Sequence, residues 1–184
     1  LMGGFPDFHL CELAIMDRLS EFTKDQNNLG IMRYMHRNDQ LYAMVASPQG
    51  TEVLPLGDAR DICDLISRLR RQLSNQPEVR HHSAPDYQRS AVDLVLTCYE
   101  LYRRLWLPLE SKLEKATRVV ILPTDELQYL PFEILLSKLP DNPTWFSQHD
   151  YLLRKYQFSY VTSVEDLFVK NQPTSSESPH QLLA

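Results

Sequence analysis

Cysteine and histidine are the residue types in this sequence that could carry out nucleophilic chemistry. Cys98 with His81 or His82 could form a dyad in which the imidazole takes the thiol proton. Cys98, however, belongs to the apolar stripe of a predicted long helix, where cysteine usually behaves as a small hydrophobic residue. The two histidines lie in a polar segment. We therefore predict no catalytic role for Cys98, nor for Cys63, which flanks the stripe of an earlier helix.

The remaining polar candidates also favour structural roles. His81 and His82 have no cysteine or carboxylate at metal-ligand spacing, so we predict no metal site. Glu133 and Asp125 could form an acid–base pair, but a hydrogen bond from Glu133 to loop amides is the simpler role. The five glycines form neither GxGxxG nor GxxxxGK. The sequence therefore predicts no catalytic, metal-binding or cofactor-binding residue.

Composition indicates one main soluble domain. The chain has 184 residues, of which 43% are hydrophobic and 23% charged. A formal charge of -5 disfavours direct binding to nucleic acid. No apolar run approaches the roughly 20 residues that a bilayer span needs, and the N-terminus lacks signal-peptide features. These features predict a cytoplasmic protein. The cysteines are odd in number and far apart, which indicates reduced thiols. They are Cys11, Cys63 and Cys98.

Hydrophobic periodicity predicts the elements of the first half. After a loop at residues 1–7, apolar residues recur at helical spacing from Phe8 to Phe22, which predicts an amphipathic helix. Its predicted apolar stripe is Leu10, Leu13, Met16, Leu19 and Phe22. A polar linker, Thr23–Asn28, leads into three β-prone runs separated by turn residues, and these predict an antiparallel meander. The runs are Gly30–His36, Leu41–Ser47 and Thr51–Leu56. Asp58 is the predicted N-cap of a helix over Ala59–Leu73.

The second half is predicted to add two helices and a buried strand. Residues 74–86 are polar and predict an exposed loop, with Asp86 as N-cap of a long helix that must end near Leu107, because Pro108 follows. The branched apolar run at residues 118–123 predicts a central strand covered on both faces. Further predicted elements are strands Tyr151–Arg154 and Phe158–Thr162 and a helix Val164–Val169.

The stretch Val119–Leu135, VVILPTDELQYLPFEIL, resembles the signature stretch of CHAT domains, which are caspase-like cysteine peptidase modules. The matching residues are Pro123, Leu127, Tyr129, Leu130, Pro131, Phe132, Glu133 and Leu135. The neighbouring segments agree in order: a meander, a helix, a long helix ending in LxxPL at Leu105–Leu109, and a Y-L to S-Y segment at Tyr151–Tyr160. The resemblance covers residues 28–170.

Two departures from the family accompany this resemblance. The family often has Asp-Gly after the strand's proline, where this chain has Thr124-Asp125, and a histidine where this chain has Gln128. The family's catalytic histidine and cysteine lie at the ends of two successive strands downstream of the Y-L to S-Y segment. This chain ends before any such residues.

The resemblance implies an α/β fold in which an antiparallel meander leads into a mixed sheet with flanking helices, as in the pseudo-protease half of caspase- and separase-like proteins. Residues 1–27 would hold a loop and a helix that could end a TPR-type repeat array. Residues 28–170 would be the non-catalytic front part of the CHAT domain, and residues 171–184 a flexible polar tail.

The implied function is to scaffold and regulate a catalytic half that is absent from this chain. Its partners would be that half, in the same polypeptide or another protein, and N-terminal helical repeats. The alternative is a self-standing protein–protein interaction module without peptidase activity. A coding sequence that continues past Ala184 into a strand-His and strand-Cys pair would favour the first hypothesis.

Overall fold

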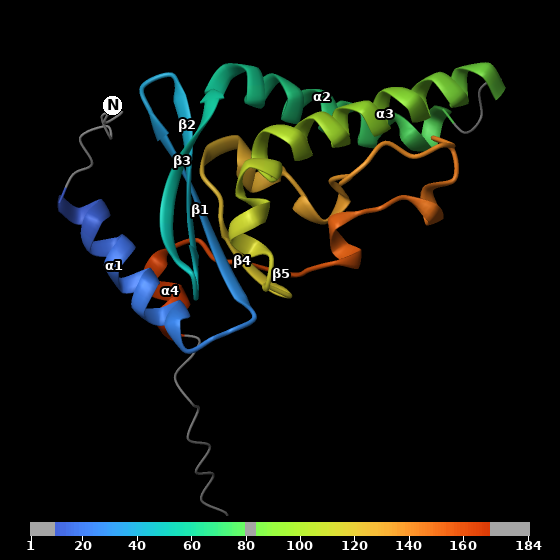
Figure 1. Cartoon of the computed structure of the whole chain (residues 1–184). Coiled ribbons are helices and arrows are strands. Elements are labelled where there is room, and N and C mark those ends of the chain that lie inside the picture. The colour runs from blue at the N-terminus through green and yellow to red at the C-terminus, as the bar shows by residue number, and fades with distance from the viewer. Residues whose placement is uncertain (1–9, 80–83, 170–184) are drawn as a thin grey trace, which may run out of the picture.

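The computed structural model describes residues 10–79 and 84–169. These residues form three layers, with a sheet between helices α2 and α3 on one face and α1 and α4 on the other (Figure 1). The helices are α1 Leu10–Lys24, α2 Ala59–Val79, α3 Ala84–Leu105 and α4 Val164–Val169. The strands are β1 Leu29–Arg37, β2 Gln40–Ser47, β3 Gly50–Asp58, β4 Arg118–Leu122 and β5 Gln157–Tyr160.

The sheet has five strands in the order β3-β2-β1-β4-β5. Strands β1, β2 and β3 are antiparallel neighbours, which confirms the predicted meander. Strand β4 lies parallel to both β1 and β5, and its Val119 and Ile121 are fully buried. The predicted α/β class with a mixed sheet and flanking helices is therefore confirmed.

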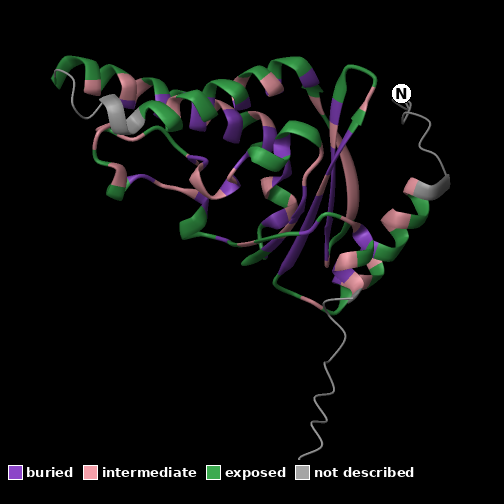
Figure 2. Ribbon diagram, turned by 180° about the vertical axis from the view of Figure 1, so that it is seen from behind, coloured by how far each residue is buried: buried purple, intermediate pink, exposed green. Residues whose placement is uncertain are grey.

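Each face of the sheet buries its own apolar cluster (Figure 2). On the α2–α3 side, the sheet packs against the predicted stripes of both helices and against short 3-10 turns. The helix residues buried there include Ile62, Ile66, Leu69, Leu94, Val95, Cys98 and Leu101. On the other side, Leu19 of α1 and Leu167 of α4 cover Ile31 and Met35 of β1. Leu13, predicted to belong to the α1 stripe, is instead 46% exposed.

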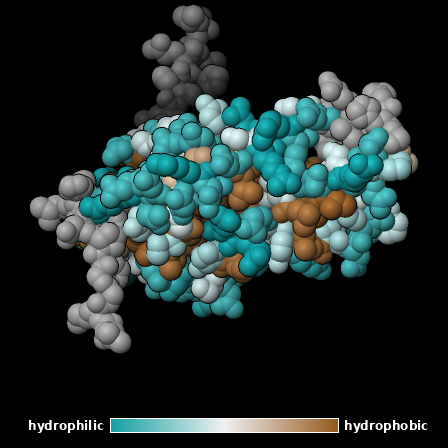
Figure 3. All heavy atoms as spheres, turned by 90° about the horizontal axis from the view of Figure 1, so that it is seen from above, coloured by the Kyte–Doolittle hydropathy of each residue, from teal (hydrophilic) through white to brown (hydrophobic). Residues whose placement is uncertain are grey.

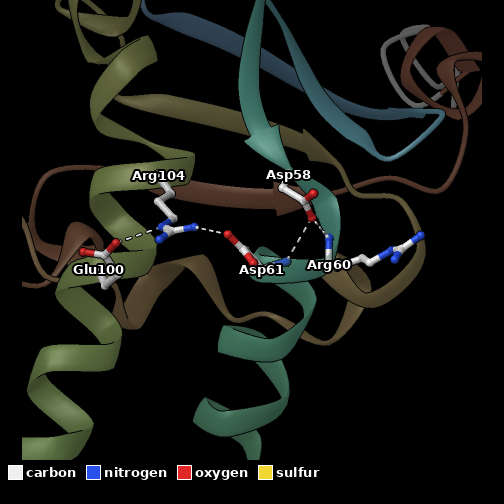
Figure 4. A network of polar contacts seen from close by, with 5 residues as sticks. All are labelled: Asp58, Arg60, Asp61, Glu100 and Arg104. Carbon is white, nitrogen blue, oxygen red and sulfur yellow. Dashed lines mark hydrogen bonds and ion pairs between the residues drawn. The ribbon is translucent and has the colours of Figure 1, made fainter.

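A polar network joins the start of α2 to the end of α3 (Figure 4). Asp58 Oδ1 accepts hydrogen bonds from the backbone amides of Arg60 at 2.8 Å and Asp61 at 3.3 Å, which confirms the predicted cap. Arg104 Nε donates to Glu100 at 2.8 Å, and its Nη1 lies 3.6 Å from Asp61. The guanidinium therefore connects the two helices.

The prediction of a loop over residues 74–86 was wrong at both ends. Helix α2 continues to Val79, and α3 begins at Ala84, before the predicted N-cap Asp86. The two helices pack against each other, and tertiary packing commonly stabilises helices that the sequence alone would not. Pro85 fits the first turn of α3, where its missing amide hydrogen costs nothing.

The predicted strand Tyr151–Arg154 was also wrong. Tyr151 forms an isolated bridge with Leu136, and Leu152–Arg154 is a 3-10 turn. The amide of Leu152 donates to Leu135 O at 2.9 Å. This segment therefore pairs with the chain beside the CHAT-like motif, which is Leu130-Pro131-Phe132-Glu133, rather than with the sheet. Helix α3 ends at Leu105, as Pro108 predicted, and a 3-10 turn over Leu107–Leu113 follows.

Some predictions concern residues outside the described part of the chain. These are the loop at residues 1–7, His81 and His82, and the tail at residues 171–184. Among the described residues, none of the helices combines the length and apolar character that crossing a membrane would need.

Candidate functional site

Strand β5 forms one border of the sheet, and in the described part of the chain only β4 pairs with it. The amides of Gln157 and Val161 donate toward β4, to Thr117 O at 2.8 Å and Ile121 O at 3.1 Å. Because backbone groups alternate in direction along a strand, the amide and carbonyl groups of Phe158 and Tyr160 point to the outer side. We call this outer side the β5 edge. Such an edge can accept another strand.

The Tyr160 hydroxyl connects the β5 edge to the Leu130-Pro131-Phe132-Glu133 motif. It donates to Glu133 Oε2 at 2.7 Å and accepts from the Phe132 amide at 3.1 Å. Burial, followed by the hydrogen bond to Glu133, raises the pKa of Tyr160 above its ordinary value. The predicted contact of Glu133 with loop amides was wrong, since its partner is this hydroxyl. The motif thereby fixes the end of β5.

An aromatic core lies beneath this contact. Phe132 is fully buried and stacks on Tyr34 of β1, with ring centroids 5.4 Å apart. Trp106, also fully buried, lies 6.4 Å from Phe132 and 5.5 Å from Phe158 of β5. The Tyr34 hydroxyl donates to Leu105 O at 3.0 Å. One cluster therefore joins the motif, the end of α3 and the β5 edge.

The turn after β4 holds Asp125 in an unusual backbone conformation. Its φ is 45°, in the left-handed region that favours glycine. This is the position at which the sequence departs from the family's Asp-Gly. The Asp125 carboxylate lies 3.2 Å from Nδ1 of His36, at the end of β1, and accepts from the Thr124 hydroxyl at 3.1 Å. Asp125 and Glu133 therefore have separate partners, and no contact joins them as an acid–base pair in the described structure.

The positive φ of Asp125 leads to a prediction about stability. Asp125→Ala and Asp125→Gly both remove the contact with His36, but only alanine is strained in the left-handed region. We expect the glycine variant to be more stable than the alanine variant by about 1 kcal/mol in urea unfolding. Equal stabilities, or a more stable alanine variant, would show that this turn does not hold the left-handed conformation in solution.

Cys98 is buried and lines an apolar cavity of about 280 Å³ between α3 and the segment before β5. Burial raises the pKa of its thiol to about 12. His149 lines the same cavity, yet its Nε2 lies 3.2 Å from Asn142 O and its Nδ1 lies 3.3 Å from the Tyr151 hydroxyl. Both ring nitrogens are therefore engaged away from the thiol, and this pair is not arranged for nucleophilic catalysis.

Cys63 has a different setting with the same chemical result. Its Sγ lies 3.5 Å from Glu126 Oε2, and burial together with that carboxylate raises its pKa to about 11. A thiol that serves as a nucleophile needs the opposite shift of its pKa.

Sequence reasoning did not find His149, because nothing in its irregular segment indicated that the ring would be buried. The described residues contain no cluster of histidine, cysteine and carboxylate side chains suited to a metal ion.

The surface over α2 and α3 is mainly hydrophilic (Figure 3). Viewed from that side, hydrophilic side chains cover most of the face, and hydrophobic side chains gather in small patches (Figure 3). The large apolar side chains exposed in the described chain include Leu73 at 37% and Leu96 at 46%. The β5 edge and its contacts with the motif are therefore the strongest candidate for a functional surface.

A family model described as the CHAT domain matches residues 96–184, from within α3 to the last residue and including β4, the motif and β5. It does not extend to residues 28–95, which the resemblance in the sequence also included. No curated protein matches the chain.

Proposed function

We propose that this chain is the non-catalytic front part of a cysteine endopeptidase, because the CHAT domain model matches residues 96–184 and CHAT domains are caspase-like modules. In this proposal the β5 edge receives the first strand of the catalytic part. That part supplies the histidine and the cysteine. The observation that carries the proposal is the position of β5 at the border of the described sheet, with outward backbone groups at Phe158 and Tyr160.

Three features support a scaffolding role. Tyr160 is fixed by Glu133 and Phe132, so the β5 edge is held in position before any strand joins it. Trp106, which follows α3, packs against Phe158 of β5, so the proposed route from α3 to β5 passes through tightly packed side chains. Both described thiols, Cys63 and Cys98, have raised pKa values, which suits residues that do no catalysis.

The proposal includes the partners and the location. Helical repeats of the TPR type would precede α1, and residues 28–170 would form the pseudo-protease part. Helix α1 packs on the sheet through Leu19, which offers a route for a signal from those repeats. We propose that the protein works in the cytoplasm, where its cysteines would stay reduced.

Amide hydrogen exchange tests the proposed docking at β5. The experiment compares this chain with the longest polypeptide that its natural coding sequence specifies. We expect the amides of Phe158 and Tyr160 to exchange at least about tenfold more slowly in the longer polypeptide, because a new strand protects them. The Val119 and Ile121 amides of the central strand are the control, and their exchange should not change. Unchanged exchange at β5 would overturn the docking.

A peptidase assay separates the proposal from its alternative. We expect this chain alone to cleave no peptide, and the longer polypeptide to do so through its own histidine and cysteine. Turnover by this chain that disappears on Cys98→Ser would overturn the non-catalytic role. A natural polypeptide without a histidine–cysteine pair would instead favour an interaction module without peptidase activity.

A further inference from the structure

A second cavity lies at the carboxyl ends of β4 and β5. After β4, the chain turns toward the α2–α3 face, where Leu127 and Phe132 join the first apolar cluster. After β5, it turns toward the opposite face, where Val164 and Leu167 join the second. Where two neighbouring parallel strands send the chain to opposite faces, a crevice opens between their ends, and ligands of α/β proteins commonly bind there.

This crevice has a volume of about 320 Å³. We call it the Arg33 crevice. Its polar lining consists of Arg33, Thr124, Thr162, Ser163 and Glu165, and its apolar wall includes Ile15, Leu122 and Val164. It is separate from the cavity that contains Cys98, and it does not involve the outer side of β5.

Arg33 is the unusual residue of the crevice. It lies on β1 between Ile31 and Met35, whose side chains are buried on the α1–α4 face, and alternation along the strand places Arg33 on that same face. Its Nη1 is shielded from solvent and has no hydrogen-bond partner in the described part of the chain. Shielding a charged N–H group without a partner is costly.

Arg104, Arg154 and Arg60 show the usual arrangement of an arginine, with a partner for the guanidinium. Arg104 donates to Glu100 at 2.8 Å, and Arg154 Nε donates to His149 O at 2.9 Å. The more exposed Arg60 reaches Asp39 at 3.0 Å. The shielded nitrogen of Arg33 beside a cavity therefore indicates a group that enters from outside the chain.

We propose that the Arg33 crevice binds a carboxylate carried on a short aliphatic group. A guanidinium holds a carboxylate through two parallel hydrogen bonds, and the apolar wall fits the attached carbon atoms. The Thr162 hydroxyl already donates to Asp166 at 2.7 Å, so Arg33 is the main donor. Glu165 lines the same space, and its charge disfavours a second negative charge, which selects a carboxylate over a phosphate dianion.

Titration of this chain, followed by NMR at the Arg33 side-chain N–H groups, tests the proposal. The probes are propanoate and the capped peptide Ala-Glu-Ala, with propionamide and capped Ala-Gln-Ala as neutral controls. We expect saturable shifts with the carboxylates and none with the amides. Tighter binding of Ala-Glu-Ala than of propanoate would identify an acidic peptide as the ligand, and equal affinities would identify a free carboxylate. Both results support the site.

Variants examine the role of each charge. Arg33→Gln should weaken carboxylate binding at least about tenfold, because the bidentate pair is lost, while Arg60→Gln should leave it unchanged. Arg33→Lys keeps the charge and should lose affinity by a smaller factor. Glu165→Gln should strengthen binding about two- to fivefold by removing repulsion. Circular dichroism confirms that each variant is folded.

Several results would overturn the proposal. These are amides that bind as well as carboxylates, Arg33→Gln with unchanged affinity, or no saturable shift up to about 100 mM, a concentration that would reveal even millimolar binding. If Arg33→Gln does not fold, the Arg33→Lys variant and the Arg33 resonances of the unmodified chain decide the question. The experiment needs no peptidase activity, so its outcome is independent of the proposed docking at β5.

Discussion

Phe132→Ala should lower the free energy of unfolding by about 3–5 kcal/mol, since the variant removes a fully buried ring and leaves a cavity. The lost contacts are those with Tyr34 and Trp106, which connect β1 and the end of α3 to the motif. Urea unfolding followed by tryptophan fluorescence measures the change, because Trp106 lies beside the missing ring.

The matched control for this prediction is Tyr129→Ala, at the residue directly before the motif. Tyr129 is 60% exposed, and its ring lies 4.6 Å from the Arg70 guanidinium carbon. Its removal should cost about 1 kcal/mol or less, which is typical of an exposed cation–π contact. If the two variants lose similar stability, the aromatic core beneath β5 is not the structure that holds the motif.

Cys98 should react with iodoacetamide on the order of 100-fold or more slowly in the folded chain than in guanidinium chloride. A pKa of about 12 reduces the thiolate fraction at neutral pH roughly a thousandfold relative to a free thiol of pKa about 8.5. The greater nucleophilicity of a more basic thiolate recovers part of that loss. Alkylation of a Cys11→Ser, Cys63→Ser variant, followed by mass spectrometry, gives the two rates.

The comparison for Cys98 is Cys63, measured in a Cys11→Ser, Cys98→Ser variant. Its pKa is about 11 and its side chain is partly exposed, so folding should slow its alkylation by a smaller factor. A folded Cys98 that reacts within about tenfold of its unfolded rate would contradict the buried position and the non-catalytic role proposed for it.

Much of the fold could be predicted because its signals are local. Turn residues between β-prone runs identified the meander, and the branched run at residues 118–123 identified a buried strand that became β4. The cap at Asp58 and the end of α3 before Pro108 depend on the chemistry of single side chains. Such features need only neighbouring residues, so the sequence carries them.

The errors came from segments that depend on distant contacts. Residues 74–79 are mostly polar, yet they continue α2, a helix that packs against its neighbour α3. Tyr151–Arg154 has the composition of a strand, but its backbone bonds to the chain at Leu135 instead of the sheet. Leu13 matches the stripe of α1 without reaching the sheet.

The residues of the CHAT-like motif were visible in the amino-acid sequence by itself. The tertiary structure decided which groups these residues contact: Tyr160 reaches Glu133 from 27 residues away, and Arg33 lies beside the ends of β4 and β5. Periodicity and spacing describe one segment at a time. Side-chain partners and crevices arise where separate segments meet, and only the packed sheet with its helices determines which segments do.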